Sequence, residues 1–561
     1  GYVGVIDEGD LNDPSNLKGK DSNGNPLYGT YQPDDFIGKN GLERKMEELL
    51  RGDKGGYFYE KNAFGVETRR LSESAIPTIP GRNIQLSIDL ELQTAISKAL
   101  AEGIDASTNG RKAKKADAVD CKGGAVVALD PRDGDVLAMV SYPQYDNQLF
   151  VTGLSQLKMK EYLDDPRGPL NDRAYAGSFP PGSTIKLFIA LAGLREGKID
   201  ETTQFTCTGG IRVPNTWNEA EGNTYPCWNH VNEDGHKAVS VVDAIERSCD
   251  VFFYNTGVPK QRPEGASQDL HYRDYFFSTR TVGELHEFRG LGIDLIYKNL
   301  KKRFWFGQPT NIDLPFEADG LVPNNQWKTA VWKNDGGWSS GDTINTSIGQ
   351  GFFLASPLQL AVNTAAIANG GRITRPKIVK ALVDDGGQSM QTFDSKLLRT
   401  VKIDAGHLAL VHEGMRRVVH DPNGTANHSV DADYQPVTKW PLTNPPGEIE
   451  IIIGGKTGTA EVGNPDENGI YSQSHAWFTC FAPFENPEIV VTVFLEKGGE
   501  GATYAVPIAD KALRGYFELT GRRKRGRVLR EDGSPITERN PGPDGTAPPA
   551  ASPAATPTAA T

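Results

Sequence analysis

The segment 179–194 constrains the fold most strongly, because helix-breaking residues stand directly before an apolar run. The Pro-Pro-Gly sequence before Ser183 cannot continue a helix, whereas the serine is a good N-cap or first-turn residue. The apolar residues 187–194 therefore predict a buried helix that begins near Ser183. The chain is expected to place a serine hydroxyl at the start of that helix.

Lys186 follows Ser183 by one helical turn, so the two side chains are predicted to be neighbours. A serine becomes a nucleophile when a base takes its proton, and a lysine serves as that base if burial keeps its amine neutral. The same spacing occurs by chance in long chains, where the serine caps a helix and the lysine extends to solvent. Other segments must decide between these interpretations.

Two later segments supply the groups that an acyl-enzyme serine needs: a proton relay and an electropositive wall for a substrate carboxylate. The first is Ser248-Cys249-Asp250, in which the hydroxyl of Ser248 is the candidate relay beside Asp250. The second is Lys456-Thr457-Gly458-Thr459, in which Lys456 and Thr457 are the candidates for the wall.

In this order, the S-x-x-K, S-x-D and K-T-G motifs resemble those of penicillin-binding proteins. The chain is similar to class B penicillin-binding proteins, most of all to the penicillin-binding protein 2 group of the elongation machinery. Asp250 stands where most of the family has asparagine, as in the elongation type. Further matches lie at 37–43, 50–52, 89–93, 171–174, 349–351 and 455–461.

This resemblance implies a peptidoglycan D,D-transpeptidase in which Ser183 attacks the penultimate D-Ala of a stem pentapeptide and is also acylated by β-lactams. It implies Lys186 as the base, Ser248 as the relay, and Lys456 with Thr457 and Thr459 as the carboxylate site. The oxyanion hole would be formed by the N–H of Ser183 and one from the strand 459–461.

The expected fold is α+β: a transpeptidase domain with an antiparallel sheet flanked by helices, preceded by a β-rich N-terminal pedestal. We expect a partial pedestal at 1–80, the transpeptidase domain at 81–520, and a disordered tail at 521–561, rich first in Arg and then in Pro, Ala and Thr. Predicted helices cover 41–50, 90–104, 240–256, 357–368 and 506–518, and predicted strands cover 84–89, 124–130, 135–140, 449–453, 476–481 and 488–496, with a strand-turn-strand unit at 55–70.

Three cysteines and a histidine bracket a long polar loop: Cys207, Cys227, His236 and Cys249. Three thiolates and an imidazole suit zinc. A Cys207–Cys227 disulfide beside a buried Cys249 is the alternative, and His230 competes with His236 as the fourth ligand. The family resemblance favours zinc, because some elongation-type members have a site here. Such a metal would be structural and would fix the segment that contains Ser248.

Composition argues against nucleic-acid binding, since 60 Lys+Arg against 72 Asp+Glu give a net charge of −12. The sequence contains no run of about 18 apolar residues, which is the length that a membrane-spanning helix needs. The resemblance implies an extracytoplasmic, periplasmic location, a single-pass inner-membrane anchor outside this sequence, and a SEDS-type glycan polymerase that docks against the pedestal.

Two other functions remain open at this stage. A non-catalytic β-lactam sensor or morphogenesis scaffold would keep an acylatable serine without crosslinking, and a D,D-carboxypeptidase would pass the acyl group to water. A G-x-S-x-G sequence at 337–341 also matches a hydrolase nucleophile motif, but we interpret it as a loop with no strand before it and no helix after it.

Overall fold

The computed structural model describes residues 1–12, 31–32, 35–113, 120–214, 222–229, 235–258, 290–333, 337–427, 442–444, 449–463, 471 and 473–525. The predictions for the tail beyond 525 and for His230 lie outside these residues.

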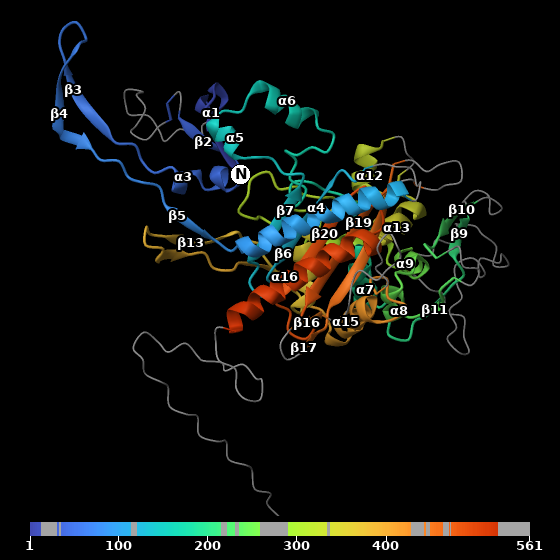
Figure 1. Ribbon diagram of the computed structural model, residues 1–561. Coiled ribbons are helices and arrows are strands. Elements are labelled where there is room, and N and C mark those ends of the chain that lie inside the picture. Colours follow the sequence, from blue (N-terminus) through green and yellow to red (C-terminus); the bar gives the residue numbers. More distant parts are fainter. Residues whose placement is uncertain are drawn as a thin grey trace, which may run out of the picture.

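A five-stranded antiparallel sheet forms the centre of the molecule, with the strand order β18-β19-β20-β6-β7 (Figure 1). Because helices cover both faces of the sheet, β6 and β20 are buried along almost their whole length and are apolar throughout. The predicted hairpin near 124–140 is confirmed as β6 and β7. The strands are β6 (Gly123–Leu129), β7 (Val136–Tyr142), β18 (Gly454–Val462), β19 (Gln473–Ala482) and β20 (Ile489–Glu496).

Helices α4 (Leu90–Ala113) and α16 (Val506–Arg525) pack against each other and cross one face of the sheet (Figure 1). Helix α14 (Pro357–Ala368) covers the opposite face, where the hydroxyl of Thr479 on β19 donates to that of Thr364 at 2.9 Å. The predicted helices at these positions are confirmed, although α4 and α16 extend further than their apolar spacing indicated. Lys456 of β18 is paired with Thr479 and therefore lies on the face that α14 covers.

Further helices surround the start of α7 (Lys186–Arg195), which is buried from Lys186 to Leu194. Contacts join α7 to α8, α9, α11 and α15. These helices belong to the same hydrophobic core as the sheet, and they position the candidate catalytic side chains. The elements of this part are η2 (Gly182–Ile185), β8 (Phe205–Cys207), β9 (Gly210–Pro214), β10 (Gly222–Pro226), β11 (Lys237–Val239), α8 (Val241–Glu246), α9 (Asp250–Gly257), α11 (Gly292–Tyr297), η3 (Lys298–Arg303), α12 (Asn325–Val331), α13 (Ser340–Ser347), α15 (Ala405–His420) and η4 (Gly501–Ala505).

The N-terminal part is rich in short strands, as expected of a pedestal. Strands β3 and β4 form a two-stranded ribbon that projects away from the rest of the molecule (Figure 1). The predicted helix 41–50 is two short helices that meet at Met46. The elements are β1 (Tyr2–Val5), α1 (Glu8–Asn12), β2 (Phe36–Asn40), α2 (Gly41–Lys45), α3 (Glu47–Leu50), β3 (Gly56–Lys61), β4 (Glu67–Ile76) and β5 (Asn83–Leu86), with α5 (Gln148–Thr152) and α6 (Gln156–Asp164) beyond β7.

Two predictions of secondary structure are wrong in an informative way. The helix predicted over 240–256 is two helices, α8 and α9, because Ser248 has a φ of 54° that no helix accommodates. The strand predicted at 449–453 pairs only with β16 (Leu442–Asn444), as β17 (Ile449–Ile451). The core strand is instead β18, whose glycines hid it from sequence reasoning.

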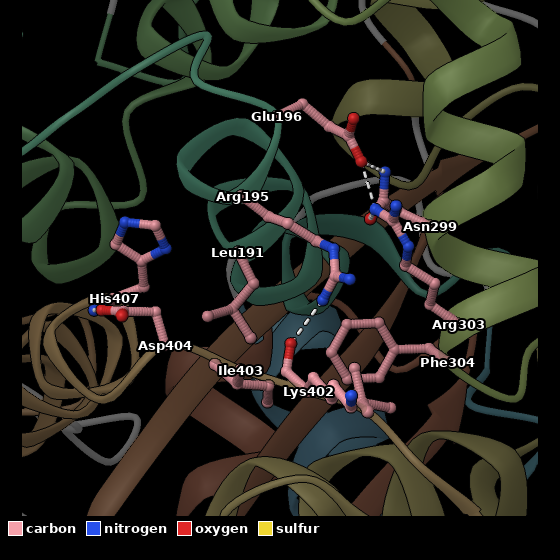
Figure 2. A pocket seen from close by; sticks show the side chains of 11 residues that line it. Leu191, Arg195, Glu196, Asn299, Arg303, Phe304, Lys402, Ile403, Asp404 and His407 are labelled. Carbon is pink, nitrogen blue, oxygen red and sulfur yellow. Dashed lines mark hydrogen bonds and ion pairs between the residues drawn. The ribbon is translucent and has the colours of Figure 1, made fainter.

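The remaining strands form small sheets at the margin: β12 (Arg372–Thr374) with β15 (Leu397–Thr400), and β5 with β13 (Val379–Val383) and β14 (Ser389–Thr392). No helix of the described part is both long and apolar enough to cross a membrane. A cavity of about 430 Å³ lies at the C-terminal end of α7 (Figure 2).

Candidate active site

Ser183 lies in the short helix η2, immediately before α7 begins at Lys186. Gly182 has a φ of 54°, and a Cβ there would lie 2.6 Å from the carbonyl oxygen of Thr459 on β18. Only glycine therefore permits this approach of η2 to the strand. Gly182, the last of the helix-breaking residues before Ser183, therefore also allows the serine to lie beside β18, the strand that contains the K-T-G motif.

Gly458 makes the same approach possible from the side of β18. A Cβ at this position would lie 2.9 Å from both the carbonyl oxygen of Pro181 and the methyl group of Thr184. The indole N–H of Trp477 on β19 donates to the carbonyl oxygen of Pro180 at 2.8 Å and fixes the segment further. Contacts from two neighbouring strands therefore hold η2 in place.

Lys186 is fully buried, and its amine donates to three oxygens. These are the carbonyl oxygen of Ser248 at 2.8 Å, its hydroxyl at 3.3 Å, and Oδ1 of Asp250 at 2.6 Å. The break between α8 and α9 turns both groups toward the lysine. The structure thus brings together three of the predicted catalytic residues, Lys186, Ser248 and Asp250.

The second carboxylate oxygen of Asp250 accepts the backbone N–H of Trp228 at 3.0 Å. Burial raises the pKa of the Asp250 carboxyl, and the positive charge of Lys186 opposes this rise. Trp228 was not predicted, because a backbone contact across 22 residues has no signature in sequence.

Lys456 is the second fully buried lysine of the site and lies on β18. Its amine donates to the carbonyl oxygen of Thr457 at 3.0 Å, and burial lowers its pKa well below the usual range, with the charge of Lys186 lowering it further. The site thus contains two amines, of Lys186 and Lys456, but one carboxylate near Lys186, that of Asp250. One further negative charge would balance the second amine. An anionic group of a substrate would supply it.

Each of the two threonines among the predicted substrate-binding residues has its own hydrogen-bond partner. Thr457 shares a hydrogen bond of 2.6 Å with the hydroxyl of Thr425, which follows α15. The hydroxyl of Thr459 accepts the backbone N–H of Gly501 at 3.2 Å. Thr425 was missed by sequence reasoning, because it is 32 residues from its partner and belongs to no motif.

The segment 349–351 contacts both η2 and β18. The N–H of Gly182 donates to the carbonyl oxygen of Gly349 at 3.0 Å. The side-chain amide of Gln350, in the orientation that satisfies both of its groups, forms two hydrogen bonds with the backbone of Glu461. Its oxygen accepts the N–H at 3.0 Å, and its nitrogen donates to the carbonyl oxygen at 3.3 Å. This segment therefore connects η2 with the end of β18.

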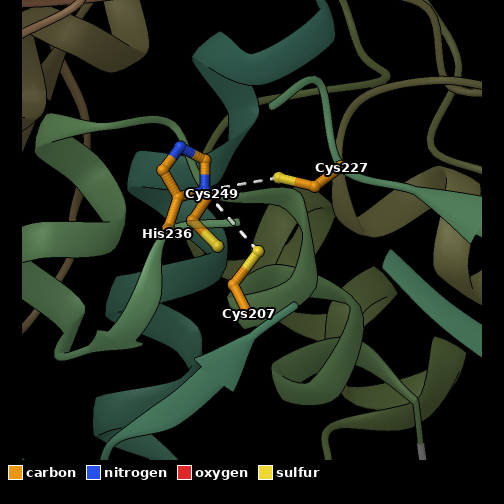
Figure 3. Close-up of side chains that lie close together, drawn as sticks. All are labelled: Cys207, Cys227, His236 and Cys249. Atoms are coloured by element: carbon orange, nitrogen blue, oxygen red, sulfur yellow. Dashed lines mark hydrogen bonds between the residues drawn. The ribbon is translucent and has the colours of Figure 1, made fainter. Parts of the chain in front are cut away.

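The four predicted metal ligands lie together beside this site (Figure 3). Their ligand atoms are all within 4.8 Å of one another, and all four residues, Cys207, Cys227, His236 and Cys249, are buried. Nδ1 of His236 lies 3.5 Å from the sulfur of Cys227 and 3.6 Å from that of Cys207. All five cysteines of the chain lie in the described part and are buried, and none forms a disulfide, so the alternative of a Cys207–Cys227 disulfide is not formed in this structure.

Local backbone geometry assembles the cysteine cluster. Strands β8 and β11 pair antiparallel, with Lys237 opposite Cys207. Gly235 has a φ of 55°, and a Cβ there would lie 2.4 Å from the carbonyl oxygen of Cys207. Cys249 is the N-cap of α9, directly before Asp250. Two members of the cluster, Cys227 and Cys249, therefore precede residues of the Trp228–Asp250 hydrogen bond.

The G-x-S-x-G sequence 337–341 has a structural role. A helix does follow it, contrary to our expectation, since α13 begins at Ser340. The hydroxyl of Ser339 accepts the N–H of Asp342 and caps that helix, and its own proton is bonded to the Asp342 carboxylate at 2.8 Å. It is not placed as a nucleophile.

Comparison with known protein families agrees with this arrangement. Residues 124–514 match the penicillin-binding protein transpeptidase domain, and residues 1–86 match the penicillin-binding protein dimerisation domain. The chain belongs to the penicillin-binding protein transpeptidase family. The family and fold class that the motifs predicted are thereby confirmed.

Within the family, the chain is similar to penicillin-binding protein 2. It is 34% identical over 530 residues to the peptidoglycan D,D-transpeptidase MrdA of Haemophilus influenzae, covering 92% of this chain and 67% of that protein. The crystal structure of Pseudomonas aeruginosa PBP2 in complex with WCK 5153 has a TM-score of 0.66 and 31% identity, covering 96% of this chain and 90% of the other. A chain from a peptidoglycan synthase complex studied for the coordination of polymerization and crosslinking has a TM-score of 0.67 and 28% identity, covering 92% and 74%.

Proposed function

We propose that this transpeptidase acts on peptidoglycan, with Ser183 as the nucleophile that crosslinks stem peptides during cell-wall elongation. The observation that carries the proposal is the buried cluster of Lys186, Ser248 and Asp250 beside a second buried lysine, Lys456. Burial of charged groups costs folding free energy, and clusters of this kind are concentrated at functional sites. The similarity to MrdA supports peptidoglycan as the substrate.

In the proposed reaction, Lys186 takes the proton of the Ser183 hydroxyl as the oxygen attacks the penultimate D-Ala carbonyl. An ester bond to Ser183 forms and the peptide bond to the terminal D-Ala breaks, while the hydroxyl of Ser248, 3.3 Å from Lys186, relays a proton to the leaving amine. The amine of a second stem peptide then attacks the ester, regenerates the serine and completes the crosslink.

The terminal carboxylate of the stem peptide would bind at β18. Lys456 provides the positive field, and the hydroxyls of Thr457 and Thr459 provide hydrogen bonds. The backbone N–H groups of Ser183 and of the strand 459–461 would stabilise the oxyanion. A β-lactam has a carboxylate and an acylating carbonyl of its own, so it would occupy the same groups.

The residues of the cysteine cluster fit a structural zinc ion, which we propose as the cofactor. Zn–S and Zn–N bonds of about 2.3 and 2.0 Å in a tetrahedron require sulfur-to-nitrogen separations of about 3.5 Å. The separations from Nδ1 of His236 are 3.5 and 3.6 Å. Zinc would fix the backbone on both sides of the Trp228–Asp250 hydrogen bond and so hold Asp250 toward Lys186.

The proposed setting is the periplasmic side of the cytoplasmic membrane, with a single-pass anchor outside this sequence. The proposed partner is a SEDS-type glycan polymerase that docks against the pedestal. Similarity to a chain of a peptidoglycan synthase complex supports a polymerase partner. The exposed aromatic side chains of the β3–β4 ribbon, such as Phe64, provide apolar surface for such contacts.

The product of the reaction tests the function. The protein is incubated with glycan strands that contain pentapeptides, and muramidase digests are analysed by mass spectrometry beside Ser183→Ala. Crosslinked dimers with release of D-Ala, both absent from the variant, are expected. Release of D-Ala without dimers would identify a carboxypeptidase instead. Labelling by fluorescent penicillin with neither product would identify a sensor or scaffold.

A further inference from the structure

The cavity of about 430 Å³ at the C-terminal end of α7 (Figure 2) is lined by none of the active-site residues described above. Helix α7 has ten residues and is therefore about 14 Å long, with Lys186 at one end and Arg195 at the other. The walls come from α7, from η3 and from the segment between β15 and α15. The volume lies in the range of about 300–1,000 Å³ that is usual for small-molecule sites.

Two cations of the cavity have no carboxylate partner in the part of the chain that the structure describes. The guanidinium of Arg195 donates to the carbonyl oxygen of Lys402, and the amine of Lys402 forms no ion pair there. A third cation, Arg303, is paired with Glu196 and also donates to Asn299 at 2.7 Å. Burial and repulsion by the charge of Arg303 lower the pKa of Arg195, and the charge of Glu196 opposes this change.

The remaining groups limit what kind of anion could bind. Asp404 uses its carboxylate to cap α15, accepting the N–H of Gly406 at 2.9 Å, and its charge disfavours a polyanion. Leu191 and Phe304 are buried apolar side chains that line the cavity beside the cations (Figure 2). A ligand that satisfies both surfaces has a single negative charge attached to an apolar body.

We propose that this cavity is a second ligand site, which binds a short peptide by its terminal carboxylate. Arg195 provides a planar pair of N–H donors for the carboxylate, Lys402 adds a second positive charge, and the apolar wall of Leu191 and Phe304 accommodates a side chain. This site lies beyond the proposed function, because none of its residues belongs to the acylation machinery.

The test is isothermal titration with N-acetyl-D-alanyl-D-alanine of protein whose active-site serine has been blocked with penicillin. We expect saturable binding at millimolar concentration, no binding of the C-terminal amide of the same peptide, and at least tenfold weaker binding to Arg195→Gln. Lys198→Gln is the matched control, since it removes one positive charge close to α7 but outside the cavity. It should bind like the unchanged protein.

Several outcomes would overturn the proposal: no saturable binding, equal binding of the amide, equal loss in the Lys198→Gln control, or equally tight binding of inorganic phosphate. A folded Arg195→Gln protein, checked by circular dichroism, is required for the comparison, and Arg195→Lys should restore part of the affinity. Penicillin labelling of the same samples reports on the proposed function separately, so a failure of one assay is not a failure of the other.

Discussion

Strand β18 and the β3–β4 ribbon have the same antiparallel pairing, but their surroundings differ completely. On β18, the side chains of Lys456 and Thr457 are 0% and 6% exposed. On the ribbon, Tyr57 is 56% exposed and Phe64 at its turn is 91% exposed. The first strand buries charge and the second exposes aromatic rings.

The difference shows that strand pairing alone does not define a functional site. Burial lowers the pKa of Lys456, so that an anionic group of a substrate would be needed to favour its charged form, and this burial requires the packing of η2, α15 and β19 around β18. Among the described elements, the close contacts of β3 and β4 are with each other, and the ribbon projects from the rest of the molecule as an exposed surface (Figure 1).

The largest effect is expected for Lys186→Met, which keeps the length of the buried side chain but removes the base. Loss of a general base lowers rates by about 10²- to 10⁴-fold. We expect that fall in the rate of acylation by a fluorescent penicillin, measured by stopped-flow or gel labelling. A rate within threefold of the unchanged protein would show that Lys186 is not the base.

Removal of the proposed zinc is expected to have the next largest effect. Chelation, or Cys227→Ser, should lower the melting temperature by about 5–10 °C and slow acylation, because Asp250 loses a fixed partner. Cys480→Ser is the matched control, since this buried thiol lies on β19 away from the cluster. An unchanged melting temperature after verified metal removal, or absence of bound zinc in elemental analysis, would contradict the zinc proposal.

Gly458→Ala tests the close approach of β18 to η2. The added methyl group meets the Pro181 carbonyl oxygen at 2.9 Å, so we expect a loss of about 1–3 kcal/mol in the free energy of unfolding and slower acylation. Gly515→Ala is the control in helix α16, where the nearest atoms are 3.8 Å away. It should be neutral or slightly stabilising in urea denaturation. Equal behaviour of the two variants would argue against the tight contact.

The smallest effect is expected on the ribbon. Val66→Ser replaces a side chain that is 59% exposed, so the free energy of unfolding should change by less than about 0.5 kcal/mol and acylation should be unaffected. A large loss of stability in urea denaturation would contradict this, because it would mean that packing of the ribbon contributes to the stability of the fold.

Local features of the sequence predicted much of the fold and site. Helix breakers located Ser183, turn residues located the β6–β7 hairpin, and motif order brought Lys186, Ser248 and Lys456 into one hypothesis. These signals are local because capping, turn chemistry and hydrophobic periodicity depend on near neighbours.

Tertiary contacts account for what sequence reasoning missed. The positive φ of Ser248 and the bond from Trp228 to Asp250 depend on segments that meet only in the folded protein. The hydrogen bond between Thr425 and Thr457 is of the same kind. Strand β18 was misplaced because its glycines, which the packing of Phe478 and Phe481 requires, reduce its strand propensity.

The identity of the acylated residue tests the central claim most directly. The protein is treated with penicillin, digested, and the peptides are sequenced by tandem mass spectrometry. The account predicts a penicilloyl group on Ser183 alone, and no adduct in Ser183→Ala. An adduct on Ser248, on Ser339 or on any other residue, or none in a folded sample of verified metal content, would contradict it.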